Sequence, residues 1–333
     1  MAVVGEIALT LNDLRKRQGV DGKTDEIIEV LEQSNPILDD MTWQEGNLTT
    51  GNKTTLRNSI PLPGVRYINK GVEYTKSSTE QIVDTSCILQ SRSKVDVELL
   101  ALASDKEGFR RSEDVAHIEG FGQKLADMVI YGSTEDDPDT FNGLEIRHRK
   151  LNVSDPTKPG YTTIDAGGTG SALTSAFLVE WGSRSATGIY PKGATAGLDH
   201  KDLGQQTVQD RDGNDYEAMV SVFTWKVGLA VRDYRACGAI RNIDVSTFKT
   251  GTVAAKQAIM ANIVTAQERL RHPDKAIMYV SNDLYTAMKL YLMDKNNSYV
   301  TTERLENGIV AVRFNGMRVV KLDAIRGNES AIS

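Results

Sequence analysis

The chain has 333 residues, of which 40% are hydrophobic, and it carries 39 Lys and Arg against 45 Asp and Glu, a formal charge of −6. The hydrophobic content excludes wholesale disorder, and the length suffices for two domains or for one domain with large extensions. The acidic balance argues against a general nucleic-acid binder, which needs clustered cations to neutralise phosphates, although such a chain could still enclose nucleic acid.

The two cysteines, Cys87 and Cys237, show no metal-ligand spacing, and we expect free thiols in a reducing compartment rather than a disulfide. No stretch approaches the roughly 20 apolar residues of a membrane span, so we expect no membrane partner. The first residues place a short apolar run ahead of the charges, the reverse of a secretion signal. We therefore expect the chain to be made in the cytoplasm.

The N-terminal part predicts two helices. The first is a short helix over residues 7–17, and Thr24 is a plausible N-cap for the second. The second helix should end near Asn35, because the residue before Pro36 disfavours the helical region. Residues 36–41 are then expected to lead into an extended stretch.

Residues 42–86 show almost no core signal. Polar β-formers alternate there with Pro61, Pro63, Gly64 and Gly71, which predicts two long strands joined by a loop. Such an arm is marginal on its own, so it would need to lie on something else, most simply a neighbouring subunit. The alternative is an ordinary surface hairpin.

Residues 93–149 indicate a broken helix, a stop and an acidic turn. Apolar residues recur at steps of three and four over 115–129, with Ser112 as the expected N-cap and Gly132 as a left-handed C-terminal cap. The acidic turn that follows at 135–139 could hold a hard cation, but it lacks the alternating spacing of a calcium loop, which favours a solvated turn.

The glycine-rich segment 155–170 lacks the Lys-Ser/Thr of a phosphate-binding loop, and 172–181 reads as a short amphipathic segment. Residues 212–214 predict a tight turn between strands. The next segment, 221–233, alternates apolar and polar residues, which indicates the strongest strand of the chain.

The C-terminal third predicts a helix over 252–270 that is stopped by Pro273, and a short buried strand over 277–280. Ser281 or Asn282 should cap a further helix. Near the end, Asn315-Gly316 between two apolar runs is a strong hairpin signal, because Asn-Gly tolerates positive φ at both central positions.

Catalytic, cofactor and metal sites are not expected. The histidines lack metal-ligand spacing, and no serine lies in a G-x-S-x-G elbow, so the chain reads as a non-enzyme without cofactors. The four histidines are His117, His148, His200 and His272.

The order of these elements, together with the segments PDTFNGLEIR, TWKVGLAVRDYRACGAIRNID and FNGMRVVKLDAI, resembles the major capsid proteins of tailed phages, in particular of short-tailed phages. The resemblance implies an α+β chain with the Hong Kong 97-type capsid fold. It implies an N-terminal arm (1–41), an extended β-hairpin loop (42–86), a peripheral domain with a long spine helix (87–165 and 308–333) and an axial domain (166–307).

The resemblance further implies a major capsid protein that self-assembles as hexamers and pentamers into an icosahedral shell around double-stranded DNA. The implied location is the virion capsid, assembled in the host cytoplasm. The implied partners are further copies of the chain, a separate scaffolding protein, a portal, a possible decoration protein and loosely held packaged DNA. In the extended loop, Arg57, Arg66 and Lys70 are the candidates for contacts between subunits. Two alternatives stay open: an encapsulin-like compartment shell, which shares the fold, and a cytoplasmic α/β enzyme.

Overall fold

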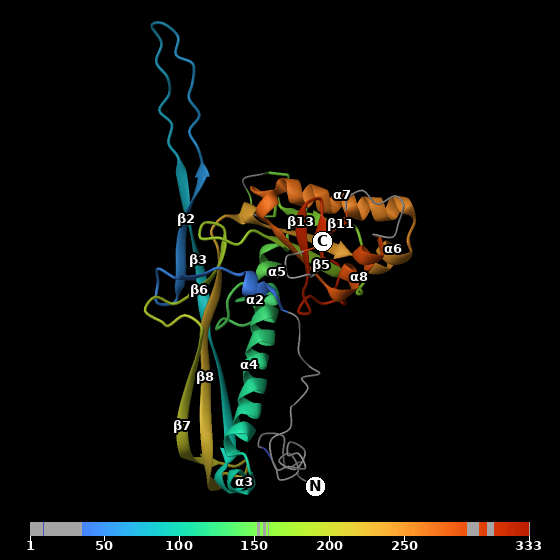
Figure 1. Ribbon diagram of the computed structural model, residues 1–333. Coiled ribbons are helices and arrows are strands. Elements are labelled where there is room, and N and C mark those ends of the chain that lie inside the picture. Colours follow the sequence, from blue (N-terminus) through green and yellow to red (C-terminus); the bar gives the residue numbers. More distant parts are fainter. Residues whose placement is uncertain are drawn as a thin grey trace. The chain divides into compact units, whose positions relative to one another are not determined.

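The computed structural model describes Leu9 and residues 35–151, 154–155, 158, 160–291, 300–304 and 310–332. The two helices predicted before Asn35 lie outside this part of the chain, apart from Leu9. The described residues form two compact units. Unit 1 comprises Leu9, Ile88–Leu125 and Thr195–Lys226, and unit 2 comprises the rest (Figure 1).

Three long elements contribute to both units, namely β3 (Ser78–Asp96), α4 (Lys106–Tyr131) and β8 (Asp215–Val231). Unit 1 adds α3 (Val97–Leu102) and β7 (Leu198–Gln209), which pairs antiparallel with β8. The turn between these two strands is the predicted one. The Asp210 carboxylate accepts the backbone N–H of Asp212 (2.9 Å) and of Asn214 (2.8 Å), so one side chain closes the loop.

The helix α4 begins at Lys106, well before the predicted cap at Ser112, so that prediction is wrong. The Asp105 carboxylate accepts the Gly108 N–H at 2.9 Å and takes the capping role, while the Ser112 hydroxyl donates to the Phe109 carbonyl at 2.8 Å. Together, α3 and α4 form the predicted broken helix. Phe109 is buried with Leu99 in a small core.

The apolar stripe of α4 is core only in its C-terminal half, where Phe121, Leu125, Met128 and Val129 are buried. Val115 and Ile118 are 45% and 47% exposed, against the prediction. Gly132 ends the helix as expected but not with positive φ. A Cβ there would lie 2.5 Å from the carbonyl oxygens of Met128 and Phe141, so the position needs glycine for space.

Unit 2 is built on a seven-stranded mixed sheet with the order β11-β12-β13-β10-β5-β9-β4. Its strands are β4 (Thr163–Asp165), β5 (Thr174–Val179), β9 (Cys237–Ile243), β10 (Ile277–Val280), β11 (Val300–Arg304), β12 (Val310–Phe314) and β13 (Met317–Lys321). Every residue of β5 is buried, because this strand lies centrally between β10 and β9. The predicted amphipathic segment is therefore a strand buried on both faces.

The helices of unit 2 supply much of its core. The three that do so are α6 (Val245–Thr250), α7 (Val253–Arg269) and α8 (Asn282–Tyr291). The 3₁₀ turn η1 (Tyr234–Ala236) lies between β8 and β9, and η2 (Pro273–Lys275) lies between α7 and β10. The predicted helix over 252–270 is confirmed as α7, and the Thr252 hydroxyl caps it by accepting the Ala255 N–H at 3.3 Å. The predicted hairpin is confirmed as well, because Asn315 (φ 45°) and Gly316 (φ 82°) both adopt positive φ between β12 and β13.

A second sheet has the order β1-β6-β8-β3-β2, and β7 joins it at β8. Its remaining strands are β1 (Trp43–Glu45), β2 (Gly51–Ser59) and β6 (Ala186–Tyr190). Two short helices belong to unit 2, α2 (Ile37–Asp40) and α5 (Leu144–Arg147). The segment 36–41 contains the short helix α2 and leads, as expected, into the extended strand β1. Pro36, with φ −64°, precedes the first turn of α2 and Ile37 is fully buried.

The segment after β13 is fastened into unit 2 by Glu329. Its carboxylate accepts the Tyr131 hydroxyl at 2.6 Å and the Ser175 hydroxyl, and it lies 3.6 Å from the Arg241 guanidinium. Burial, together with the charge of Glu329, raises the pKa of Tyr131, so this phenol stays protonated and donates. The chain terminus is thereby tied to the end of α4 and to β5.

Candidate functional site

The hairpin formed by β2 and β3 has a rigid root in unit 2. The two strands pair antiparallel from Gly51↔Thr85 to Arg57↔Thr79. Gly51 has φ +153°, and a Cβ at this position would lie 2.0 Å from the Asp84 carbonyl oxygen, so only glycine lets the strands approach here. The pairing register is fixed at the base of the hairpin.

A buried ion pair fastens this root. The Arg147 guanidinium donates to the Asp84 carboxylate at 2.7 Å, with side chains 20% and 3% exposed. Arg147 also donates to the carbonyls of Asn142 (3.2 Å) and Leu229 (3.3 Å), and the Asp84 carboxylate accepts the Val231 N–H at 3.3 Å. The hairpin therefore leaves unit 2 from a fixed base.

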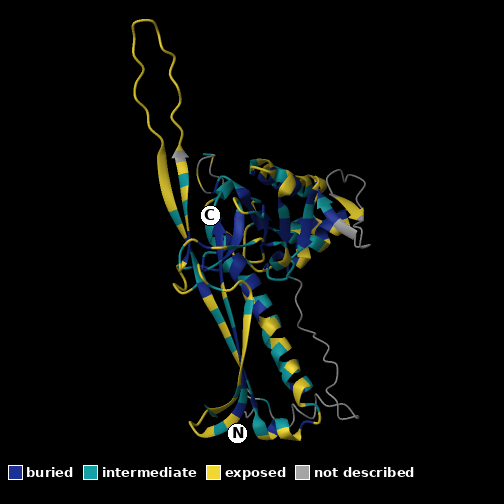
Figure 2. Cartoon of the chain, turned by 60° about the vertical axis from the view of Figure 1, so that its left-hand side comes forward, coloured by how far each residue is buried: buried dark blue, intermediate teal, exposed yellow. Residues whose placement is uncertain are grey.

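The distal part of the hairpin, residues 60–77, has a different character. It carries no strand assignment, and the backbone hydrogen bond described within it is Lys70 N–H to the Tyr67 carbonyl at 3.1 Å. It projects away from the other elements of unit 2 and is exposed along its length (Figures 1 and 2). We call residues 60–77 the hairpin tip.

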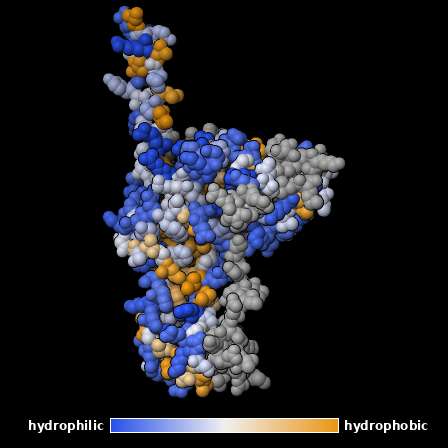
Figure 3. Space-filling model, in the orientation of Figure 1, coloured by the Kyte–Doolittle hydropathy of each residue, from blue (hydrophilic) through white to orange (hydrophobic). Residues whose placement is uncertain are grey.

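Large apolar side chains line the hairpin tip, with exposed fractions from 46% at Val72 to 106% at Tyr74. The set comprises Ile60, Leu62, Val65, Tyr67, Ile68, Val72 and Tyr74. Figure 3 shows hydrophobic side chains spaced among polar ones along this projection. Seven exposed large apolar side chains on one short projection mark an interaction site, and a two-stranded arm has too little of its own core to bury them.

The three predicted contact residues are exposed but are not brought together. Arg57 lies on β2, Arg66 lies in the hairpin tip and Lys70 lies in the turn at its end, and none of them forms an ion pair within the described residues. Sequence reasoning selected these cations and missed the apolar side chains. The available signal was the run IPLPGVRYI at 60–68, in which bulky apolar residues alternate with prolines in a segment that lacks a core pattern.

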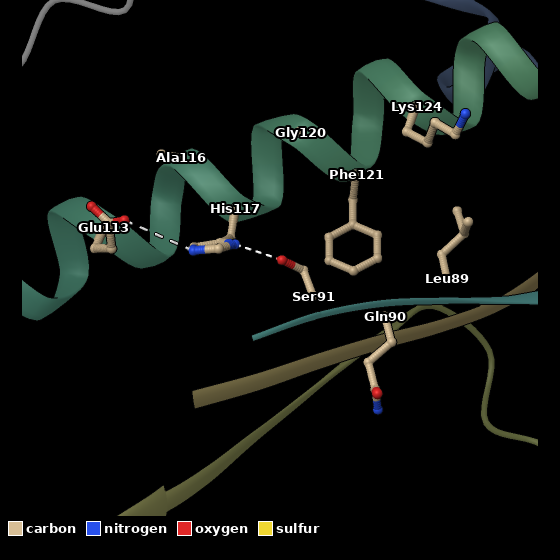
Figure 4. A pocket seen from close by; sticks show the side chains of 9 residues that line it. All are labelled: Leu89, Gln90, Ser91, Glu113, Ala116, His117, Gly120, Phe121 and Lys124. Carbon is tan, nitrogen blue, oxygen red and sulfur yellow. Dashed lines mark hydrogen bonds and ion pairs between the residues drawn. The ribbon is translucent and has the colours of Figure 1, made fainter. Parts of the chain in front are cut away.

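A groove of about 530 Å³ lies between α4 and β3 in unit 1 (Figure 4). Its polar side is a chain of contacts in which the Ser91 hydroxyl lies 2.6 Å from His117 Nδ1, and His117 Nε2 lies 3.9 Å from the Glu113 carboxylate. Its apolar side is formed by Leu89 and Phe121. The contact between His117 and Ser91 joins α4 to β3, a role for His117 that the sequence did not indicate.

A second cavity, of about 490 Å³, lies at the hairpin root and includes Arg147, His148 and Cys237. Burial, with the charges of Arg241 and Arg147, lowers the pKa of His148 to about 3, and burial raises the pKa of the Cys237 thiol to about 12. Neither group changes its protonation near neutral pH. At neutral pH this histidine is therefore not protonated and this thiol is not ionised.

Both cysteines, Cys87 and Cys237, are buried. Within the described ranges, no group of three or more His, Cys, Asp or Glu side chains could hold a metal ion. No helix in the described part of the chain is both long enough and apolar enough to cross a bilayer.

The sequence matches one protein family over residues 19–333, the family described as Major capsid protein GP7. No curated protein matches the chain. Among solved structures, a chain from the near-atomic structure of bacteriophage epsilon15 aligns with a TM-score of 0.75 at 28% identity, covering 100% of this chain and 99% of that chain.

Two further solved structures extend the comparison. A chain of the bacteriophage JBD30 capsid aligns with a TM-score of 0.50 at 10% identity, covering 90% of this chain and 95% of that one. At this identity the similarity concerns the fold alone. A chain of the holo-SrpI encapsulin complex from Synechococcus elongatus PCC 7942 reaches a TM-score of 0.41 at 13% identity, covering 72% of this chain and 97% of that one. The last similarity is too low to bear on function.

Proposed function

The chain belongs to the Major capsid protein GP7 family, and from this premise we propose that its hairpin tip is the element that joins copies into a shell. The protein is a phage capsid shell protein with the Hong Kong 97-type α+β fold. It self-assembles, its place is the virion capsid, and it is not an enzyme.

The finer organisation is part of the proposal. Hexamers and pentamers of the chain would form an icosahedral shell around double-stranded DNA, with a separate scaffolding protein, a portal and a possible decoration protein as partners, and with assembly in the host cytoplasm. The formal charge of −6 supports loose enclosure of DNA, because a strongly cationic wall would hold the genome by counterion release. The arm at 1–41, the loop at 42–86 and the peripheral and axial boundaries given above are proposed as the domain plan.

One observation carries this proposal, namely a rigid hairpin root that presents an exposed apolar tip. Full burial of a large apolar side chain is worth roughly 1.5–3 kcal/mol, so covering several of them on a neighbouring copy would stabilise each contact substantially. Because the root is fastened by the Asp84–Arg147 pair, little order has to be gained there on association. The contact is repeated by every copy in a shell.

The two alternatives raised by the sequence lack a comparable observation. An encapsulin-like shell would share the fold, but the similarity to the encapsulin chain carries no weight at a TM-score of 0.41. The enzyme alternative is not supported by the family match, because that family consists of structural capsid proteins.

The test is a variant in which Ile60–Lys76 is replaced by a short Gly-Ser turn. Since this segment contributes no buried side chain to unit 2, we expect a folded subunit with an unchanged thermal midpoint and no closed shells in negative-stain images. The matched control replaces Arg57, Arg66 and Lys70 with alanine and keeps the apolar tip. Closed shells from the turn variant, at the yield of the unaltered chain, would refute the proposed role.

A further inference from the structure

The cavity at the hairpin root is lined by four separate parts of unit 2. One face of the β2–β3 hairpin supplies Leu56, Glu80 and Ile82, which share a side because Leu56 pairs with Glu80 and Ile82 lies two residues further along β3. The other lining residues come from 147–148, 158–162 and 231–237. The volume of about 490 Å³ lies within the range of roughly 300–1,000 Å³ that is typical of small-molecule sites.

Two cations line this cavity, Arg147 and Lys158. The hydrogen bonds described for the Arg147 guanidinium all leave from Nη2, and its Nε is buried without a partner in the described part of the chain. A guanidinium carries five N–H donors, so Arg147 has donors left for a further acceptor. Lys158 is exposed and forms no ion pair with any described residue, and Glu80 is the one acid among the described lining residues.

A buried hydroxyl also lines the cavity. Thr162 is 1% exposed, and its Oγ1 has no hydrogen-bond partner among the residues that the structure describes. Its backbone is fixed, because the Thr162 carbonyl accepts the Ala239 N–H at 3.1 Å. Nearly all buried polar groups in native proteins are hydrogen-bonded, so this hydroxyl and the Arg147 Nε point to a partner that comes from outside the subunit.

Much of the remaining lining is apolar. Val231 and Cys237 are buried, and Leu56 and Ile82 are half-buried. His148 adds no charge at neutral pH, because burial and the charges of Arg241 and Arg147 lower its pKa to about 3. The cavity therefore combines an apolar wall with unused donors on two cations, and this combination suits a molecule with an anionic head and an apolar body.

We propose that the cavity at the hairpin root binds an anionic amphiphile, with its carboxylate held by Arg147 and Lys158 and its apolar chain against Leu56, Ile82 and Val231. A carboxylate accepts two parallel hydrogen bonds from a guanidinium, which fits the donors that Arg147 has left. This inference does not depend on the joining role of the hairpin tip, because every lining residue belongs to unit 2 of a single copy. A bound molecule bridges the hairpin to 158–162 and 231–237, so binding stabilises the hairpin root.

The first test is calorimetric titration of the unassembled full-length chain at pH 7. The probes are decanoate, acetate and decyltrimethylammonium, each below its micelle concentration. Decanoate should bind saturably at one site per chain. Acetate lacks the apolar chain and the ammonium has the opposite charge, so each should bind at least about tenfold more weakly than decanoate. Absence of saturable decanoate binding, or equal binding of the cationic probe, would overturn the proposal.

The second test locates the head group by comparing Lys158→Gln with Lys150→Gln. Both lysines are exposed, but only Lys158 lines the cavity, and neither change should shift the thermal midpoint. Because a hydrogen bond to a charged group is lost, Lys158→Gln should weaken decanoate binding about tenfold or more, whereas Lys150→Gln should leave it unchanged. Equal affinities of the two variants would show that decanoate binds elsewhere.

The third test locates the apolar chain by comparing Leu56→Gln with Val83→Gln. Val83 is 54% exposed and, unlike its neighbour Ile82, does not line the cavity, because successive strand residues point to opposite faces. Leu56→Gln should weaken the binding of decanoate several-fold and leave that of acetate unchanged, and Val83→Gln should change neither. Equal decanoate affinities of the two variants would contradict the proposed placement. If Leu56→Gln fails to fold, Lys158→Gln still decides the assignment to this cavity.

Discussion

The ion pair at the hairpin root gives the most quantitative prediction. Asp84→Asn keeps the shape of the side chain but removes the charge that faces Arg147 at 2.7 Å. Breaking a buried pair by removing one partner costs about 3–5 kcal/mol, because the remaining charge is left uncompensated. Arg147 keeps 20% side-chain exposure and two carbonyl acceptors, so we place the loss of unfolding free energy near the lower limit, about 3 kcal/mol.

The assay is urea unfolding of the unassembled full-length chain at pH 7. The matched control is Glu135→Gln, which removes one of the two carboxylate partners of Arg149, in a pair of 2.9 Å whose side chains are 42% and 71% exposed. Exposed pairs contribute about 0–1 kcal/mol, so the control should lose less than about 1 kcal/mol. Equal losses for the two variants would refute the view that the Asp84–Arg147 pair fixes the hairpin root.

Two further predictions concern unit 2. Because the pKa of His148 is lowered to about 3 in the fold, the unfolded chain binds a proton that the folded chain does not between that value and the ordinary value near 6.5. The free energy of unfolding should therefore decrease as the pH is lowered below about 6.5, by up to about 1.4 kcal/mol per pH unit. The difference between the urea midpoints at pH 7 and pH 5 should be smaller in His148→Gln than in the unaltered chain. An unchanged difference would contradict this reading. Glu329→Gln should lower the thermal midpoint clearly more than Glu303→Gln, because Glu329 is buried and contacts Tyr131, Ser175 and Arg241, whereas Glu303 is an exposed partner of Arg313. Equal midpoints of the two variants would show that Glu329 does not fasten the terminal segment.

Local signals predicted the parts of the fold that local geometry decides. Asn315-Gly316 fixed a hairpin because few other residue pairs adopt positive φ twice, and Thr252 with Pro273 bracketed α7. The start of α4 was misplaced because Ser112 and Asp105 are equally good caps in sequence. Burial of Phe109 against Leu99 favours the earlier start, and that contact is visible only in three dimensions.

The candidate site was harder to predict for a related reason. The sequence identified the hairpin as a segment without a core, but it could not tell which apolar residues stay exposed. The predicted contact residues were therefore the charged ones, Arg57, Arg66 and Lys70. The groove is assembled from β3 and α4, whose facing residues are distant in the chain and carry no shared motif. The burial of β5 likewise depends on its central place in the sheet rather than on its own pattern.

Hydrogen exchange of the hairpin tip, measured in unassembled subunits and in closed shells, tests most directly whether copies cover one another there. In the free subunit, residues 60–77 should exchange near the intrinsic rate, since Lys70 has the one backbone bond described within them. In shells, their amides should become protected by roughly 100-fold or more, because a covered segment exchanges only when the contact opens. Equally fast exchange of these amides in both states would contradict the account.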